Sequence, residues 1–144
     1  MKPKTIFITV FFAAAASLGA LGISAAVDSP RTLMSPADFS TGKRAIEAET
    51  RVALARCRDV AAVERDVCKA QVRGEERVKV AELKARYHGT VVSRDEVSLA
   101  RAKSLYDVAK ARCAGRLGEE RVDCLRAARD DRNRSLAAVR VNAT

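Results

Sequence analysis

Two pairs of cysteines at the same spacing constrain this chain more than any other feature of its sequence. Cys57 and Cys68 lie 11 positions apart, and Cys113 and Cys124 repeat that spacing 56 positions later. A disulfide permits only certain chain paths between its two cysteines. The fold therefore has to satisfy the same local constraint twice.

The residues in front of each cysteine pair repeat with it, at the same shift of 56 positions. In the first copy, four residues share one face of a helix: Ile46, Thr50, Ala53 and Cys57. In the second copy, a coiled-coil-like seam steps by three and four residues: Leu99, Ala102, Tyr106, Ala109 and Cys113. The sequence thus indicates an internal duplication. We expect an all-α fold with four main helices in two duplicated hairpins, packed as a bundle or as an antiparallel coiled-coil-like structure.

Two pairings of the cysteines remain open at this point. A helix running unbroken through each pair would separate its Cα atoms by about 16 Å, beyond the reach of about 7 Å that a disulfide has. The bonds would then have to join the two repeats. If the chain turns back between the cysteines, each repeat is instead a hairpin stapled by its own bond, Cys57–Cys68 or Cys113–Cys124.

The residues between the cysteines favour the stapled hairpins, more clearly in the second repeat than in the first. Gly115 and Gly118 support a helix end and a turn in the second repeat. The first repeat has no glycine or proline between its cysteines, and Asp59 is the residue that we expect to end the helix there.

The composition of this chain includes few large apolar side chains that could form a thick core. Apolar residues make up 48% of the sequence, but aromatic residues make up only 4%. Of the aromatic residues, we place only Tyr87 and Tyr106 inside the helical region and Phe39 in front of it. Small side chains bury little apolar area, so we expect covalent staples to matter. Closing a loop of this size stabilises a fold by about 3 kcal/mol in the chain-entropy model.

Start and stop signals predict where the helices begin and end. Ser35 and Pro36 fit the first positions of a helix, but Gly42 leads us to place the firm start near Lys43. Gly89 suits the end of a helical run that covers residues 65–87. The third helix begins after it.

The later helices have their own signals. Ser93 and Glu96 have the spacing of a capping box, with Ser93 as the N-cap of the third helix. The last helix is expected from about Glu119 to Arg140. The predicted organisation is a signal peptide (1–26), an extended leader (27–42) and two hairpin repeats (43–88 and 89–144).

The N-terminal segment has the features of a secretory signal peptide. Lys2 and Lys4 precede an apolar stretch, and Ser24 to Ala26 form a small-residue cleavage pattern, which predicts cleavage after Ala26. The alternative is a retained membrane anchor, because residues 5–26 carry no charge and are long enough to span a bilayer. An even number of cysteines in a small exported chain predicts disulfides. We therefore expect a periplasmic or secreted protein.

The stretch from Tyr106 to Cys113, "YDVAKARC", with a glycine-containing turn and a second cysteine behind it, resembles a family of small exported helical proteins of Gram-negative bacteria. These proteins carry one or two such cysteine-pair repeats, and some are labelled Tol-type envelope proteins. The resemblance covers residues 43–140. The first repeat departs from it, with Thr50 in place of the tyrosine and Ala62 in place of the turn glycine. The family is functionally uncharacterised, so the resemblance implies no catalytic residues.

The sequence offers no catalytic or metal-binding set, and we expect neither an enzyme nor a cofactor. The only histidine, His88, precedes the helix stop at Gly89, where a polar or cationic side chain complements the helix dipole. The cysteine spacing is neither the C-x-x-C of thiol-redox sites nor the C-x₂₋₄-C of zinc sites.

Basic residues give the chain a second possible role. The formal net charge is +9 for the whole chain, and loss of Lys2 and Lys4 with the signal peptide leaves +7. The last helix holds an arginine cluster that we name as a candidate anion-binding set: Arg126, Arg129, Arg132, Arg134 and Arg140. Such a cluster attracts polyanions such as lipopolysaccharide phosphates. Stacking aromatic residues do not accompany it, which disfavours nucleic acid.

These observations favour a non-enzymatic envelope protein, a structural, adaptor or stress-related module that binds another protein. The alternative is a basic protein that binds a polyanion. A membrane partner is expected only if the N-terminal segment is retained.

Overall fold

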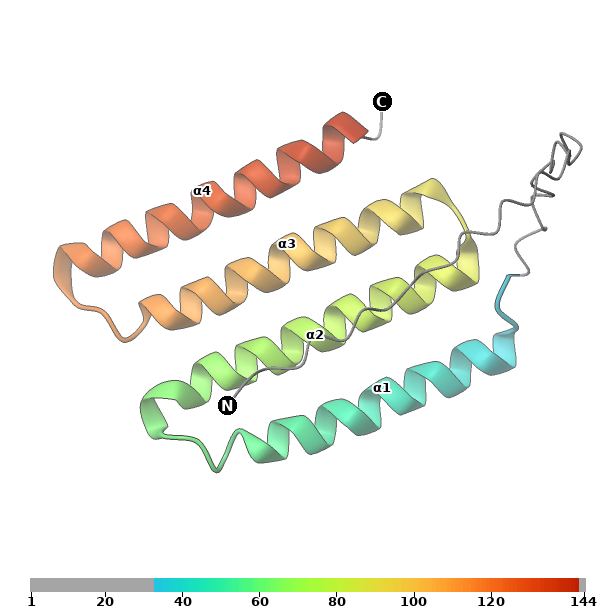
Figure 1. Ribbon diagram of the computed structural model, residues 1–144, viewed down its shortest axis with the longest axis horizontal. Coiled ribbons are helices and arrows are strands. Elements are labelled where there is room, and N and C mark those ends of the chain that lie inside the picture. The colour runs from blue at the N-terminus through green and yellow to red at the C-terminus, as the bar shows by residue number, and fades with distance from the viewer. Residues whose placement is uncertain (1–32, 143–144) are drawn as a thin grey trace, which may run out of the picture. The chain divides into compact units, whose positions relative to one another are not determined.

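The computed structural model describes residues 33–142, with side chains as far as residue 139. Four antiparallel helices lie side by side in chain order (Figure 1): α1 (Pro36–Arg56), α2 (Ala62–His88), α3 (Val91–Cys113) and α4 (Gly118–Asn142). Within these residues each helix packs only against its neighbours in the chain, and α2 with α3 forms the most extensive contact. The all-α class, the four helices and the two hairpins are confirmed.

Helix α1 begins earlier than the sequence predicts. Ser35 is its N-cap, the Ser35 hydroxyl accepts a hydrogen bond from the Asp38 amide at 3.1 Å, and Pro36 occupies the first turn. The expected start near Lys43 is therefore wrong, and residues 36–42 are helical instead of extended. Gly42 lies inside the helix, where a Cβ would meet Leu83 Cδ1 of α2 at 2.9 Å. The glycine marks a close helix approach and not a helix end.

This early start brings a third aromatic residue into the helical region. Phe39 belongs to α1, and its ring centroid lies 4.6 Å from that of Tyr87 on α2. The expectation that Phe39 lies in front of the helices is wrong for the same reason as the helix start. The expected signal peptide and the leader as far as residue 32 lie outside the described residues.

The turn between α2 and α3 is shorter than the sequence predicts. Gly89 ends α2 with a left-handed conformation at φ 67°, as expected. The N-cap of α3 is Thr90, whose hydroxyl accepts a hydrogen bond from the Ser93 amide at 3.1 Å. The capping box with Ser93 as N-cap is therefore wrong. Thr90 takes that role because it directly follows the helix-ending glycine, so Val91 and Val92 form the first turn of α3.

The core is a set of thin apolar seams between neighbouring helices. Its buried apolar residues are mostly small: Ile46, Cys57, Ala81, Leu83, Ala100, Ala102, Cys113 and Ala128. The seam from Ile46 to Cys57 faces α2 as expected, but Leu99, at the start of the second seam, is exposed. Small residues allow close helix approach and bury little area per residue.

The contact between α2 and α3, which joins the two repeats, contains a buried polar group. A Cβ at Gly74 would lie 3.0 Å from Ser104 Cβ, so the two helices touch there. The Ser104 hydroxyl lies 2.9 Å from the Gly74 carbonyl oxygen and accepts a hydrogen bond from Arg77 at 3.2 Å. Arg77 also pairs with Asp107 at 3.0 Å. Buried polar groups of this kind require their partners, so they fix the register between the repeats.

Candidate functional site

Each repeat is closed by its own disulfide. The Cα atoms of Cys57 and Cys68 lie 5.6 Å apart, and those of Cys113 and Cys124 lie 5.7 Å apart. The structure therefore has the stapled hairpins, and the described residues contain no free cysteine. Disulfides persist in oxidising compartments, so the two bonds indicate an exported location.

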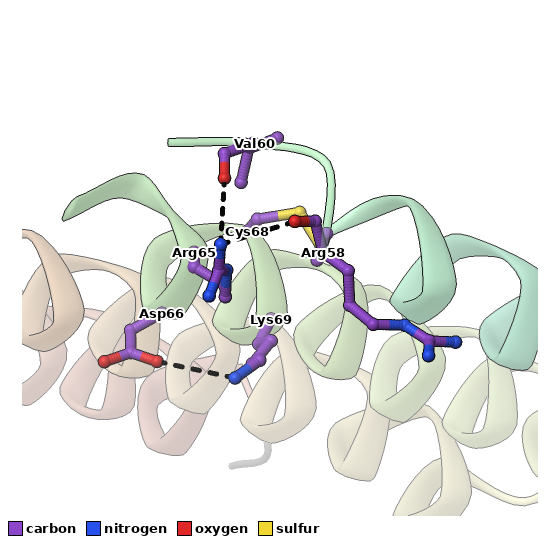
Figure 2. Close-up of a disulfide and its surroundings, with 7 residues drawn as sticks. Arg58, Val60, Arg65, Asp66, Cys68 and Lys69 are labelled. Carbon is purple, nitrogen blue, oxygen red and sulfur yellow. Dashed lines mark hydrogen bonds and ion pairs between the residues drawn. A yellow bond between two sulfur atoms is a disulfide. The ribbon is translucent and has the colours of Figure 1, made fainter. Parts of the chain in front are cut away.

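The first staple closes a turn that has no glycine, and an arginine stabilises it (Figure 2). Arg65 lies on the first turns of α2 and points back toward residues 57–61. One of its terminal nitrogens donates to the carbonyl oxygens of Arg58 and Val60, at 3.4 and 3.5 Å. Ala61 precedes α2 without a side-chain cap. The guanidinium thus donates hydrogen bonds to carbonyl groups that would otherwise have only water as a partner.

The second staple closes a turn that uses glycine, as the sequence predicts. Gly118 has a φ of 55°, in the left-handed region that favours glycine. A Cβ at Gly115 would meet no described atom within 4 Å, and its φ is not positive, so this turn does not depend on Gly115. In the first repeat α1 ends at Arg56, and the backbone N–H of Asp59 donates to the Arg56 carbonyl oxygen at 3.0 Å. Arg65 contacts the turn beyond the helix end and does not end α1.

A groove runs along α3 between α2 and α4, and we call it the α3 groove. Its volume is about 1010 Å³. Its apolar and small lining residues come from all three helices: Gly74, Val78, Ala102, Leu105, Tyr106, Val108, Ala109 and Ala128. Leu105 is 69% exposed, which is unusual for a large apolar side chain along a helix interface. A second, smaller hollow of about 450 Å³, lined by residues of α2 and α3, includes Arg73 and Glu96.

The residues at the centre of the α3 groove differ from their counterparts in the first hairpin, although the two hairpins are repeats. Glu49 and Lys79, the counterparts of Leu105 and Ser135, form an ion pair at 2.6 Å between α1 and α2. The hydrogen bond to Glu49 raises the pKa of Lys79 above its usual value. In the second hairpin this pair is replaced by an apolar side chain and a hydroxyl, both of which line the groove. The replacement puts an apolar side chain where the first repeat has a charged one.

Charged side chains surround the apolar part of the groove. Five are basic and three are acidic: Lys79, Arg101, Arg112, Arg132, Arg134, Glu75, Glu82 and Asp131. Two of the acids pair with groove arginines, Glu82 with Arg101 at 2.7 Å and Asp131 with Arg134. The guanidinium of Arg132 lies 4.7 Å from the centre of the Tyr106 ring, a cation–π contact between α4 and α3.

The candidate anion-binding arginines have different surroundings. Arg126 pairs with Asp123 at 2.6 Å and Arg134 pairs with Asp131, both on α4 itself. Arg132 turns toward α3 and Tyr106. Arg129 is exposed. The side chain of Arg140 lies outside the described residues. The groove therefore receives two members of the set, Arg132 and Arg134.

The histidine, possible metal ligands and possible membrane-spanning helices are the other features raised by the sequence. His88 is exposed in the last turn of α2, and its ring stacks edge-on against Tyr87 at 5.0 Å. Over the described residues, no three His, Cys, Asp or Glu side chains are grouped so that they could hold a metal ion. None of the four described helices is both long enough and apolar enough to cross a membrane.

Comparison with known proteins adds no assignment. No protein-family model matches the chain, and neither a curated protein nor a solved structure matches it. The candidate site therefore stands on its geometry.

Sequence reasoning missed the α3 groove, although the repeat alignment contains a signal for it. Aligning the repeats at the shift of 56 sets the exposed Leu105 against Glu49, a change from charge to a large apolar side chain. That difference marks the surface on which the second hairpin departs from the first.

Proposed function

We propose that this chain is a non-enzymatic, exported envelope protein that binds another protein through the α3 groove. The observation that carries the proposal is the exposed Leu105 in a groove of about 1010 Å³ formed by three helices. Apolar patches with a polar rim mark interaction sites on soluble proteins. The rim of ion pairs around Leu105 has this character.

The cellular location is part of the proposal. Two disulfides in a small chain fit the periplasm or the extracellular space. The signal-peptide features of residues 1–26 and the resemblance to small exported proteins with C-x₁₀-C repeats support the same location. On this proposal the chain acts after cleavage behind Ala26, as a structural or adaptor module of the envelope.

The test compares the protein with a variant in which one residue of the second repeat is replaced by its counterpart from the first. Leu105→Glu installs the residue found at the equivalent position 49. Both proteins are immobilised and exposed to periplasmic extract. We expect partners that bind reproducibly to the unchanged protein and are lost with Leu105→Glu.

The matched control is Val52→Glu, which adds the same charge at another exposed apolar residue, on α1 and outside the groove. It is expected to retain the partners. Recovery of no reproducible partner, or equal loss with both variants, would overturn the proposed function.

A further inference from the structure

We propose that the α3 groove receives one amphipathic α-helix of a partner protein, with acidic side chains beside its apolar stripe. This inference rests on the proposed function and deepens it, because it names the chemistry of the partner. It follows from the shape of the groove, the position of its apolar residues and its unpaired charges.

The shape of the groove fits a helix. Its lining residues extend from Gln71 to Glu82 on α2 and from Arg101 to Arg112 on α3. Each stretch is about 16 Å long at 1.5 Å per residue, or three helical turns. The two stretches lie along antiparallel, neighbouring helices, with the lining residues of α4 on the other side of α3. A fifth helix laid on this row would contact all three.

The apolar residues of α3 are spaced for helix packing. Ala102, Leu105, Tyr106 and Ala109 follow one another at i, i+3, i+4 and i+7, and all line the groove. Small residues at both ends permit close approach, and Leu105 projects between them with most of its surface exposed. This is the arrangement by which a groove accepts the anchoring side chains of an amphipathic helix.

The charges of the groove favour an acidic helix. Lys79, Arg101 and Arg134 already have carboxylate partners, and Arg112 and Arg132 have none among the described residues. The one acid of the groove outside these pairs, Glu75, acts on Lys79, whose pKa it helps to raise. Arg132 donates to the side-chain oxygen of Asn133 at 3.2 Å and lies over the Tyr106 ring, and neither contact neutralises its charge. Five basic side chains thus face four acidic ones, Glu49 included, so the groove has an excess of one positive charge, and Arg112 and Arg132 are its cations without an ion pair among the described residues. Complementary charge directs partner choice.

The same charges disfavour a second copy of this chain as the occupant. A symmetric contact places the same patch of both copies face to face. It would bring two sets of Arg112 and Arg132 together, and each copy would add only one groove acid outside the ion pairs, Glu75. The net charge of +7 that remains after cleavage behind Ala26 adds to that repulsion.

The test uses synthetic peptides of defined chemistry with the oxidised protein. The main probe is a fluorescent peptide of about four helical turns, with leucine and alanine on one stripe and glutamate elsewhere. A second peptide has lysine in place of every glutamate. A third has the composition of the first in an order that destroys the stripe. Binding is measured by fluorescence anisotropy at low and at physiological salt.

We expect the acidic amphipathic peptide to bind at least about tenfold more tightly than the lysine peptide, because charge complementarity selects partners. The scrambled peptide should also bind more weakly. Leu105→Glu and Arg112→Gln should each weaken binding of the acidic peptide. Val52→Glu and Arg116→Gln, which make equivalent changes outside the groove, should leave it unchanged. Circular dichroism of each variant checks that its helices are retained.

Three results would overturn the inference. They are equal binding of the acidic and lysine peptides, no binding of either, and binding of the scrambled peptide as tight as that of the acidic one. Inorganic polyphosphate that displaces the acidic peptide and binds Leu105→Glu equally well would also overturn it, in favour of a simple anion surface. If partners from periplasm depend on Leu105 while the acidic peptide fails, the proposed function stands and only the helix chemistry is wrong.

Discussion

At the turn between α1 and α2, one arginine replaces the backbone freedom that a glycine provides in the second repeat. Arg65 donates to the carbonyl oxygens of Arg58 and Val60, whereas the second turn uses Gly118 in a left-handed conformation. Hydrogen bonds from charged donors are stronger than hydrogen bonds between neutral groups. Two repeats with the same staple therefore reach the same turn by different local chemistry.

This difference predicts unequal effects of two equivalent substitutions. Arg65→Ala should lower the free energy of unfolding by about 1 kcal/mol, because it removes two long hydrogen bonds that are only partly shielded from solvent. Arg121→Ala, at the equivalent position 56 residues later, should change it by less than about 0.5 kcal/mol, as for ordinary surface residues. Urea unfolding measures both. Equal effects would contradict the role given to Arg65.

A second residue-scale prediction concerns the contact of α2 with α3. Gly74→Ala improves intrinsic helix propensity by about 1 kcal/mol, but its Cβ would lie 3.0 Å from Ser104 Cβ. We expect a net loss of stability of about 1 kcal/mol, because the buried hydroxyl and its partners have to shift. Gly115→Ala, with open space around it, should be neutral or slightly stabilising. Thermal unfolding measures the stability of both variants. A Gly74→Ala protein that is more stable than the unchanged protein would show that α2 and α3 are not in close contact at this position.

At the scale of the helical elements, each staple stabilises one end of one hairpin. Replacing Cys57 and Cys68 by alanine should lower the free energy of unfolding by about 3 kcal/mol in the chain-entropy model. Amide hydrogen exchange should accelerate first at the end of α1 and the start of α2, since local opening follows the loss of local constraints. The same should hold for α3 and α4 with the other pair. Uniform acceleration over all four helices would contradict independent staples.

The sequence predicts the elements better than their ends. The cysteine spacing leaves two pairings open, and the glycines of the second turn favour the stapled hairpins that the structure has. The seam from Ile46 to Cys57 predicts residues that share a helix face, and both of its ends are buried. Helix starts are harder to predict, because Gly42 signals both a helix end and a close approach, and only the position of Leu83 on another helix distinguishes them.

The candidate site depends on which helices become neighbours. The periodicity of the sequence indicates that Leu99 and Ala102 lie on one face of a helix. It does not indicate that the exposed Leu105 lines a groove while Leu99 does not. That follows from the placement of α2 and α4 on either side of α3, which no local pattern contains. Likewise, the order of residues shows the arginine cluster of α4. Which of these arginines form ion pairs, as Arg126 and Arg134 do, depends on the direction of their side chains.

At the scale of the whole molecule, the duplication gives two hairpins with the same staple and different surfaces. The first hairpin has the exposed ion pair of Glu49 and Lys79, and the second has Leu105 and Ser135, which line the α3 groove, at the equivalent positions. The register between the hairpins is fixed by Ser104 and its partners on α2. The groove requires both hairpins in this order, because α2 forms one of its walls.

The most direct test of this account is peptide mapping without reduction, together with the intact mass, of the protein recovered from the cell envelope of its host. The account predicts a chain that begins at Val27, with Cys57 linked to Cys68 and Cys113 linked to Cys124. Links between the repeats would contradict the stapled hairpins and, with them, the α3 groove. Free thiols or an intact Met1 would contradict the exported, oxidised state on which the proposed function depends.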